Sequence, residues 1–159
     1  AYVLSENEME AMFYWVTALL YYFKEGMSYP QKAVNLKWIK RCGTLLHHME
    51  ELDGTWGGGG IQFSLALYYG ILPGFLGGDP QKSNDYMEKA FETGPGWLLN
   101  HWGRAKYFHV ENENKAGFLE DLNWVLDQEI DTAGGFYPWK VYFQNDARTM
   151  LEHTDLYFK

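Results

Sequence analysis

Cysteine is almost absent from this sequence of 159 residues, which contains only Cys42. A single thiol excludes an intramolecular disulfide and a zinc site built from cysteines. Basic residues are also scarce, because 13 Lys and Arg stand against 21 Asp and Glu and give a formal net charge of −8. An acidic chain of this kind is a poor partner for nucleic acid, so we expect no nucleic-acid binding.

Long apolar runs are missing as well. The longest extends from Ala11 to Phe23 and is too short to cross a bilayer, so it fits a buried helix better than an interfacial one. Apolar residues cover nearly the whole circumference of this helix, which predicts burial on several sides or docking on another chain. The chain begins at Ala1 without a visible signal peptide or lipoprotein cysteine. We therefore expect processing, or a further N-terminal portion of a longer precursor.

Catalytic motifs are scarce too. The sequence holds neither an HExxH pair nor a GxSxG nucleophile elbow. The glycine runs at 57–60 and 77–78 follow no predicted strand and contain no lysine, which favours turns over phosphate loops. Carboxylate pairs such as Glu120–Asp121 are interpreted as solvated helix faces. We expect a protein without catalytic residues, and an enzyme ranks third among our hypotheses.

Five histidines are present, but their spacing does not favour a metal site. His47 and His48 are neighbours on a predicted helix and point about 100° apart, so they cannot easily share one ion. His101 and His109 lie loosely on one side of a later helix. We expect surface or half-buried histidines, no metal and no cofactor.

Aromatic side chains are in excess: they make up 18% of the sequence, with seven Trp, twelve Tyr and ten Phe. Aromatic residues provide large contact areas, and Tyr and Trp keep a polar tip that suits grooves and interfaces. They can fill a core, line a ligand cleft and mediate assembly. Together with the apolar run from Ala11 to Phe23, the aromatic excess favours a structural subunit embedded in a larger assembly.

Residues 56–95 have the pattern of one complete helical hairpin. An apolar helix is predicted at about 61–72, where Pro73 ends it. Asp79 then caps a second helix whose first residue, Pro80, has no amide hydrogen to leave unsatisfied. The second helix places three residues on one face at i, i+4 and i+7, as a tetratricopeptide unit does: Ser83, Met87 and Ala90.

Similar signals predict helices along the rest of the chain, at about 5–25, 30–52, 97–110, 115–128 and 138–156. A capping box at Ser5 and Glu8 opens the first of them. Two pairs of segments repeat: 51–56 aligns with 92–97 at a spacing of 41, and 66–69 with 105–108 at a spacing of 39. Such a period is typical of arrays of helix pairs. We expect an all-α fold of six helices in three antiparallel hairpins, stacked as a tetratricopeptide-like α-solenoid with a right-handed superhelix, in a single domain over 1–159.

Binding is expected on the first helix of each pair, because first helices line the concave surface of such arrays. Asn100 and Arg104 are i, i+4 neighbours that can present two donors to a carboxylate. The candidate binding residues are these two with the aromatics beside them, and three from the corresponding earlier helix: Trp97, Asn100, Arg104, Tyr107, Gln62, Tyr68 and Tyr69. In the alternative interpretation, Arg104 pairs with a nearby Glu and the aromatics pack as core.

The corner of the hairpin carries a family resemblance. Leu72-Pro73, Gly77-Gly78-Asp79-Pro80 and Lys82-Ser83 resemble the T-component (TatT-like) proteins of tripartite ATP-independent periplasmic (TRAP) transporters. Further matches lie at Leu98-Leu99-Asn100, at Ala105-Lys106-Tyr107-Phe108, and in the Phe-x3-Leu-x2-Val-Leu pattern from Phe118 to Leu126. Ser83 and Met87 stand where the family commonly has Ala and Phe.

The resemblance implies an all-helical, tetratricopeptide-like protein of the periplasm that is typically lipid-anchored, forms homo-oligomers (trimers being the known form) and works with a solute-binding protein. It brings no catalytic residues. We therefore expect a non-catalytic periplasmic binding or adaptor protein for a solute-binding protein, an apolar organic acid, or both. The alternative is a structural accessory subunit of a larger, membrane-associated assembly with no small ligand.

Overall fold

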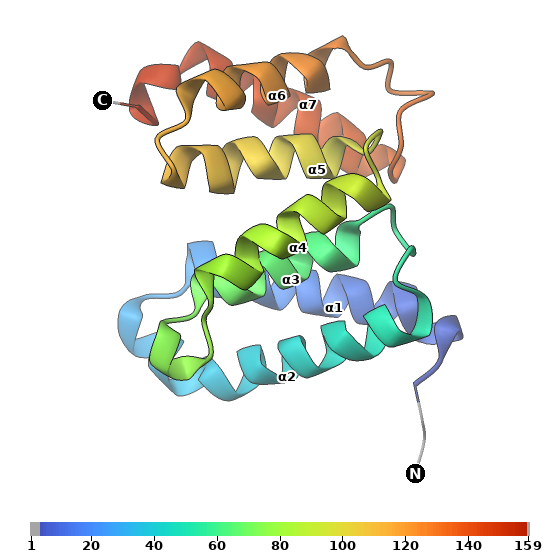
Figure 1. The fold of residues 1–159 in the computed structure, drawn as a ribbon, viewed down its shortest axis with the longest axis vertical. Coiled ribbons are helices and arrows are strands. Elements are labelled where there is room, and N and C mark those ends of the chain that lie inside the picture. Colours follow the sequence, from blue (N-terminus) through green and yellow to red (C-terminus); the bar gives the residue numbers. More distant parts are fainter. Residues whose placement is uncertain (1–3, 159) are drawn as a thin grey trace. The chain divides into compact units, whose positions relative to one another are not determined.

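The computed structural model describes residues 4–158, and its regular structure is helical (Figure 1). The expected all-α class is confirmed. Contacts divide the chain into two compact units: residues up to 56 together with 60–89, and residues 57–59 together with those from 90 onward. The expected single domain and the stacking into a right-handed solenoid stay predictions.

The number of helices differs from our expectation. The part of the chain that the structure describes has seven α-helices, one in each of the seven helical ranges that the sequence predicts, so the total of six was wrong. An odd number of helices cannot be divided entirely into hairpins. They are α1 (Met9–Tyr21), α2 (Tyr29–Asp53), α3 (Gly60–Ile71), α4 (Pro80–Thr93), α5 (Leu98–Gly103), α6 (Lys115–Asp127) and α7 (Tyr137–Glu152). Two π-helices continue α1 and α5: η2 (Tyr22–Gly26) and η4 (Arg104–His109).

In the first unit, α2 packs against both α1 and α3 (Figure 1). The start of the chain follows from its caps, since Ser5 and Glu8 form the expected capping box, and Ser28 forms a second one with Gln31 before α2. The buried core of the unit draws on all three helices: Met9, Met12, Val16 and Leu20 from α1, Ile39, Cys42, Leu46 and Met49 from α2, and Ile61 and Leu65 from α3.

Helix α1 buries only one face, although its sequence is apolar nearly all round. Trp15, Tyr21 and Tyr22 are 41%, 51% and 52% exposed. Burial on several sides within the described chain was therefore a wrong expectation. The other expectation, that this helix docks on another chain, stays a prediction for its exposed face. None of the helices in residues 4–158 combines the length and the apolarity needed to cross a membrane.

The corner between α3 and α4 forms as its sequence predicts. The Asp79 side chain accepts a hydrogen bond from the Lys82 amide at 3.1 Å, and Pro80 begins the helix. Gly77 has φ of 102°, a left-handed conformation that favours glycine. A Cβ at Gly78 would overlap the Leu72 carbonyl. The Ser83 hydroxyl then donates to the Ala66 carbonyl at 2.8 Å, which ties α4 to α3.

In the second unit, α6 packs against α5, η4 and α7, and α5 also packs against α7. The apolar stripes of these helices meet in one core made of Leu98, Trp102, Ala105, Phe118, Leu122, Val125, Phe143, Ala147 and Met150. Because α6 lies against three partners, a polar residue on its inner face is removed from water. One such residue, Asp121, is central to the site described next.

Candidate functional site

The three candidate binding residues in the first unit, Gln62, Tyr68 and Tyr69, differ in how far they are buried. Gln62 is 1% exposed, and its amide nitrogen donates to the Gly54 carbonyl, so it closes the C-terminal end of α2. Tyr68 and Tyr69 are half-buried at the end of α3. A Cβ at Gly43 would overlap the Tyr68 ring, so this glycine makes room for the tyrosine.

Tyr69 belongs to an aromatic cluster with Tyr86 and His47. The two tyrosine rings stack at 5.7 Å with an interplanar angle of 7°, and the Tyr69 hydroxyl lies 2.9 Å from His47 Nε2. The Tyr86 hydroxyl donates to Glu50 at 3.2 Å, and Lys89 pairs with the same carboxylate. Burial, followed by the charge of Glu50, raises the pKa of Tyr86 to about 12. The cluster therefore presents the neutral phenol of Tyr86 beside a carboxylate whose charge Lys89 balances.

In the second unit, Trp97 lies on the glycine run. A Cβ at either Gly58 or Gly134 would overlap the Trp97 ring, so the indole occupies space that only glycines leave open. Its ring meets Phe136 edge to face at 6.3 Å. Trp97 is half-buried and remains partly accessible.

Asn100 is completely buried and acts as a clamp on backbone carbonyls. Its amide nitrogen donates to the carbonyls of Ala90, Gly94 and Gly58 at 3.0, 2.8 and 3.0 Å. These bonds join the glycine run to the end of α4. The Ala90 and Gly94 carbonyls also accept the backbone amides of Gly94 and Trp97, so Asn100 adds a second donor to each. The geometry gives Asn100 a structural task, and its side chain does not reach solvent.

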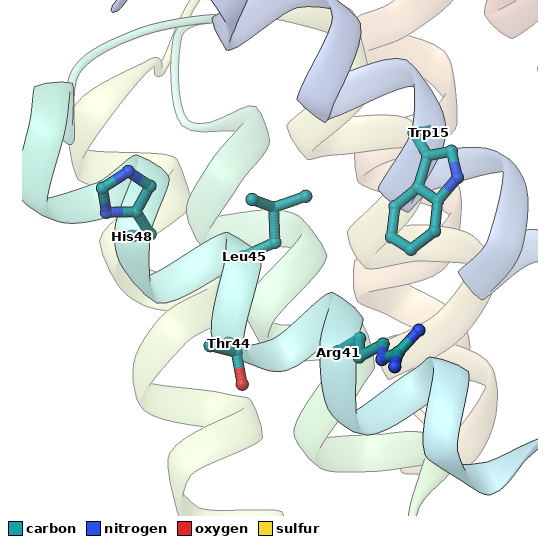
Figure 2. Close-up of a pocket in the computed structure, with 5 residues that line it drawn as sticks. All are labelled: Trp15, Arg41, Thr44, Leu45 and His48. Atoms are coloured by element: carbon teal, nitrogen blue, oxygen red, sulfur yellow. The ribbon is translucent and has the colours of Figure 1, made fainter. Parts of the chain in front are cut away.

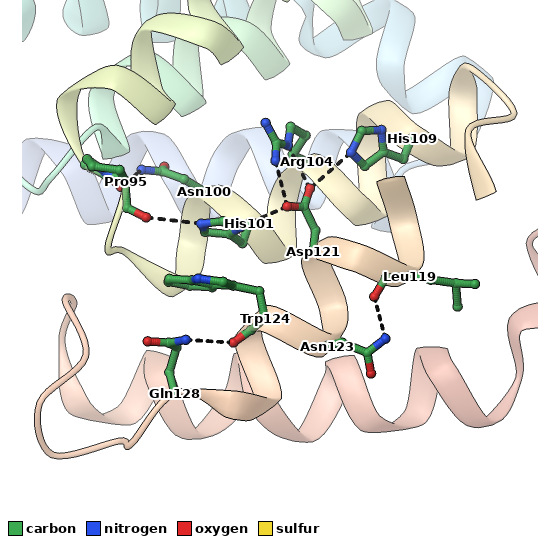
Figure 3. A network of polar contacts seen from close by, with 11 residues as sticks. Pro95, Asn100, His101, Arg104, His109, Leu119, Asp121, Asn123, Trp124 and Gln128 are labelled. Carbon is green, nitrogen blue, oxygen red and sulfur yellow. Dashed lines mark hydrogen bonds and ion pairs between the residues drawn. The ribbon is translucent and has the colours of Figure 1, made fainter. Parts of the chain in front are cut away.

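Arg104 pairs with Asp121 of α6 rather than with an external ligand (Figure 3). Its Nε and Nη2 each donate at 2.7 Å, one to each carboxylate oxygen, which is the bidentate geometry that arginine favours. The alternative we stated, an arginine paired within the chain, therefore describes the structure, with an Asp in place of the Glu. Asn100 and Arg104 do not converge on one acceptor.

Two histidines complete the shell of Asp121. His101 Nδ1 lies 2.8 Å from one carboxylate oxygen, and His109 Nε2 lies 3.1 Å from the other (Figure 3). His101 Nε2 also faces the Pro95 carbonyl at 3.1 Å, so only a doubly protonated ring donates to both acceptors. The Asn114 side-chain amide lies 3.1 Å from His109 Nδ1, so the ring contacts an amide on one side and the Asp121 carboxylate on the other.

The electrostatics of Asp121 follow from this shell. The side chain is 2% exposed. Burial alone would raise the pKa of Asp121, but the hydrogen bonds from Arg104 and the two histidines, with the charge of Arg104, outweigh it and hold the pKa well below its usual range. The carboxylate is therefore charged near neutral pH, and it holds three side chains in place.

Aromatic rings enclose the same centre. His101 stacks on Trp124 at 3.6 Å with an interplanar angle of 13°, and Phe91 meets its ring at 4.4 Å. The Arg104 guanidinium lies 3.7 Å from the Phe91 ring centroid. Stacking and cation–π contacts restrict these side chains, so the network is rigid.

Tyr107 is only 9% exposed, and its ring packs edge to face on Trp102 at 5.8 Å. Trp102 in turn donates to Asp146 at 2.8 Å, as does Lys106. Of the seven candidates, Gln62, Asn100 and Tyr107 are buried, while Tyr68, Tyr69, Trp97 and Arg104 are partly accessible.

Sequence reasoning missed Asp121 and the joint role of the two histidines. Interpreting Glu120–Asp121 as a solvated pair was wrong for Asp121. The signal was available, because Asp121 follows Phe118 by three residues and therefore lies on the apolar face of α6. Among the described residues, no group of three or more His, Cys, Asp and Glu side chains is placed to hold a metal ion.

An open hollow is present elsewhere, between α1 and α2 of the first unit (Figure 2). It has a volume of about 360 Å³ and is lined by Trp15, Arg41, Thr44, Leu45 and His48. None of these residues was among our candidates.

The fold and these sites define an all-helical protein whose polar centre is saturated by its own side chains and whose surface carries several exposed aromatic side chains. The family follows from comparison with known sequences: a family model of the TRAP transporter T-component matches residues 3–158. The chain belongs to this family, as the hairpin corner predicted. No curated protein matches it.

Proposed function

We propose that this protein is a non-catalytic subunit of a TRAP-type uptake system, which works in the periplasm and binds a solute-binding protein. The match of the T-component family over residues 3–158 carries this proposal, because it includes both compact units. Binding to other transporter subunits and assembly into a homo-oligomer belong to the same proposal.

The accessible candidates supply the contact surface. Tyr68 and Tyr69 at the end of α3, with Tyr86 stacked on Tyr69, offer large and rigid side chains, the kind that is enriched where interfaces gain most affinity. Trp97 and Arg104 add a second accessible group. The buried Gln62, Asn100 and Tyr107 support the backbone beneath them.

Geometry favours a protein partner over an apolar organic acid. An acid bound at Arg104 would share the guanidinium with Asp121, which already takes its Nε–Nη2 edge and balances its charge. The Arg104 side chain keeps 32% of its surface exposed, which allows contact with a partner. Binding of an organic acid is therefore the secondary form of the proposal.

A structural accessory subunit without a small ligand is the second candidate. The exposed Trp15 and Tyr21 of α1 and Tyr22 of η2 favour it, because large exposed aromatic groups mark assembly surfaces. Sedimentation of the purified chain separates the two: a monodisperse small oligomer supports the binding subunit, and aggregation that a partner relieves supports the accessory subunit.

Titration calorimetry tests the leading proposal, with the solute-binding protein of the same transporter as the partner. We expect Tyr69→Ala to weaken binding by roughly tenfold or more, as at other aromatic hot spots. Tyr69→Phe keeps the ring and is expected to bind almost normally. Tyr137, 59% exposed on α7, provides the control, and Tyr137→Ala is expected to leave affinity unchanged.

Absence of binding by the wild-type chain would contradict the proposal, as would equal losses in Tyr69→Ala and Tyr137→Ala. Thermal melts of each variant separate a lost contact from a lost fold.

A further inference from the structure

The outer face of α1 and α2 combines a hollow with a concentration of positive charge. We define this basic face by Trp15, Lys37, Trp38, Lys40 and Arg41, together with the hollow that Thr44, Leu45 and His48 complete. Every member lies in the first compact unit. The face differs from the Tyr69 cluster used above, so the inference is independent of the proposed function.

Charge on this face is opposite to that of the chain as a whole. Residues 26–49 contain Lys32, Lys37, Lys40 and Arg41 but no Asp or Glu, whereas the full chain carries a net charge of −8. Lys37, Lys40 and Arg41 are exposed. None of the ion pairs between residues 4–158 involves these three. The net charge of the sequence conceals this local excess.

The Arg41 guanidinium lies over the Trp38 ring, in a position from which it can bind a planar anion. Its guanidinium carbon lies 4.7 Å from the Trp38 ring centroid, and Lys37 Nζ lies 5.6 Å from the same ring. Trp38 itself meets Trp15 at 6.4 Å, edge to face. A guanidinium that lies over an aromatic face still presents its N–H edge, which suits bidentate binding of a carboxylate.

The hollow beside Arg41 is apolar and open. In Figure 2, Trp15 from α1 forms one side, and Leu45, Thr44 and His48 from α2 form the other. His48 is fixed there, because its Nε2 lies 3.0 Å from the Leu4 carbonyl. An apolar group that enters the hollow would therefore contact an indole and a leucine side chain, with a cation at the rim.

We propose that the basic face docks an acidic segment of a partner protein, with one bulky apolar side chain in the hollow and carboxylates on Arg41, Lys37 and Lys40. Lys37 and Leu45 are eight positions apart on α2, a distance of about 12 Å along the helix. An extended segment covers this length with about four residues. The partner therefore carries its acidic residues within about four positions of the apolar anchor.

Other occupants fit less well. The hollow is near the lower end of the volume range of small-molecule pockets, and its openness would leave much of a free ligand in water. A membrane surface needs protruding apolar side chains, whereas this site recedes and needs a protruding group to fill it. An acidic protein segment supplies both the protruding group and the opposite charge.

Selection from a phage-displayed library of random peptides tests the proposal on the whole chain. We expect a consensus with one large apolar residue and two or more acidic residues close to it. Synthetic peptides of that consensus are then measured by fluorescence anisotropy. Arg41→Glu and Trp15→Ala are expected to weaken binding by roughly tenfold or more, because they remove the charge pair and the wall of the hollow.

Lys115→Glu is the matched control, because it makes the same change in net charge at an exposed position in the second unit. It is expected to bind like the wild type. A consensus without acidic residues, peptides that bind Arg41→Glu as tightly as the wild type, or an equal loss in Lys115→Glu would overturn the proposal. So would Arg41-dependent binding to phosphatidylglycerol vesicles without peptide binding, which would assign the face to a membrane.

Discussion

Arg104 and Asp121 are joined by two parallel hydrogen bonds of 2.7 Å, although seventeen positions separate them in the sequence. The pair links the π-helix η4 to α6 and holds a carboxylate that is 2% exposed. An unpaired carboxylate at that depth would be strongly unfavourable, so the arginine is a condition for burying it. The stability of the second unit is therefore expected to depend on this pair.

We expect Arg104→Ala to lower the free energy of unfolding by about 3 kcal/mol, because it leaves the Asp121 charge with only its two histidines. Urea denaturation followed by circular dichroism measures the change. Arg148, which is exposed and bonds only to Asn145 in the described structure, is the control. Arg148→Ala is expected to change stability by less than about 0.5 kcal/mol. Equal effects of the two substitutions would show that the Asp121 pair contributes no stability.

Acid should remove the contribution of Asp121. The pKa of Asp121 in the folded state lies below the value of about 3.9 expected for an unfolded chain, so its ionisation stabilises the fold above about pH 4. This contribution is lost as the pH falls from that value towards the folded-state pKa. The stability difference between the wild type and Asp121→Asn is therefore expected to be largest near neutral pH and to shrink in acid. A difference that stays constant from neutral pH into acid would refute this.

Asn100 and Asn123 form a matched pair of asparagines. We expect Asn100→Ala to cost about 2–3 kcal/mol, because the carbonyls of Ala90, Gly94 and Gly58 each lose a hydrogen bond. Asn123 is exposed and donates to the Leu119 carbonyl within α6 (Figure 3). Asn123→Ala is expected to be neutral or slightly stabilising, since alanine favours helices. Similar losses of unfolding free energy in both variants would show that the hydrogen bonds of Asn100 to the three carbonyls add no stability.

Substitutions at three glycines, Gly96, Gly57 and Gly58, are expected to have graded effects on stability. Gly96→Ala is expected to be nearly neutral, because its Cβ meets open space and its φ is not positive. Gly57→Ala is expected to cost about 1 kcal/mol for its φ of 68° alone. Gly58→Ala should cost clearly more, because its Cβ would also overlap Trp97. Melting temperatures that do not follow this order would show that Trp97 is not held against Gly58.

Cys42 should react slowly in the folded protein. It is buried in the core of the first unit, and burial raises its pKa to about 11. Few thiolates are present near neutral pH, and reagent has no path to them. We expect Ellman's reagent to label the native chain far more slowly than the same chain in urea. Rapid labelling without denaturant would mean that α1 and α2 open frequently.

Sequence patterns predicted what depends on near neighbours. The capping box of Ser5 and Glu8 and the cap at Asp79 formed as expected, because each joins atoms within about one helical turn. The α3–α4 corner also pointed to the family. The roles of Asn100 and Arg104 were not predictable in this way, since their acceptors are chosen by packing between helices.

The meeting of His101 and His109 at one carboxylate shows this limit most clearly. In a regular α-helix, positions eight apart differ by about 80° around the axis, so the two rings would lie only loosely on one side of the helix. One additional residue in a π-turn removes about 100° of that rotation and brings the two positions to within about 20°. The π-helix η4, Arg104–His109, lies between them. The sequence by itself determined the helices, their caps and the family; only the tertiary structure decided the π-turn and the buried Asp121, because both depend on how α6 packs against η4.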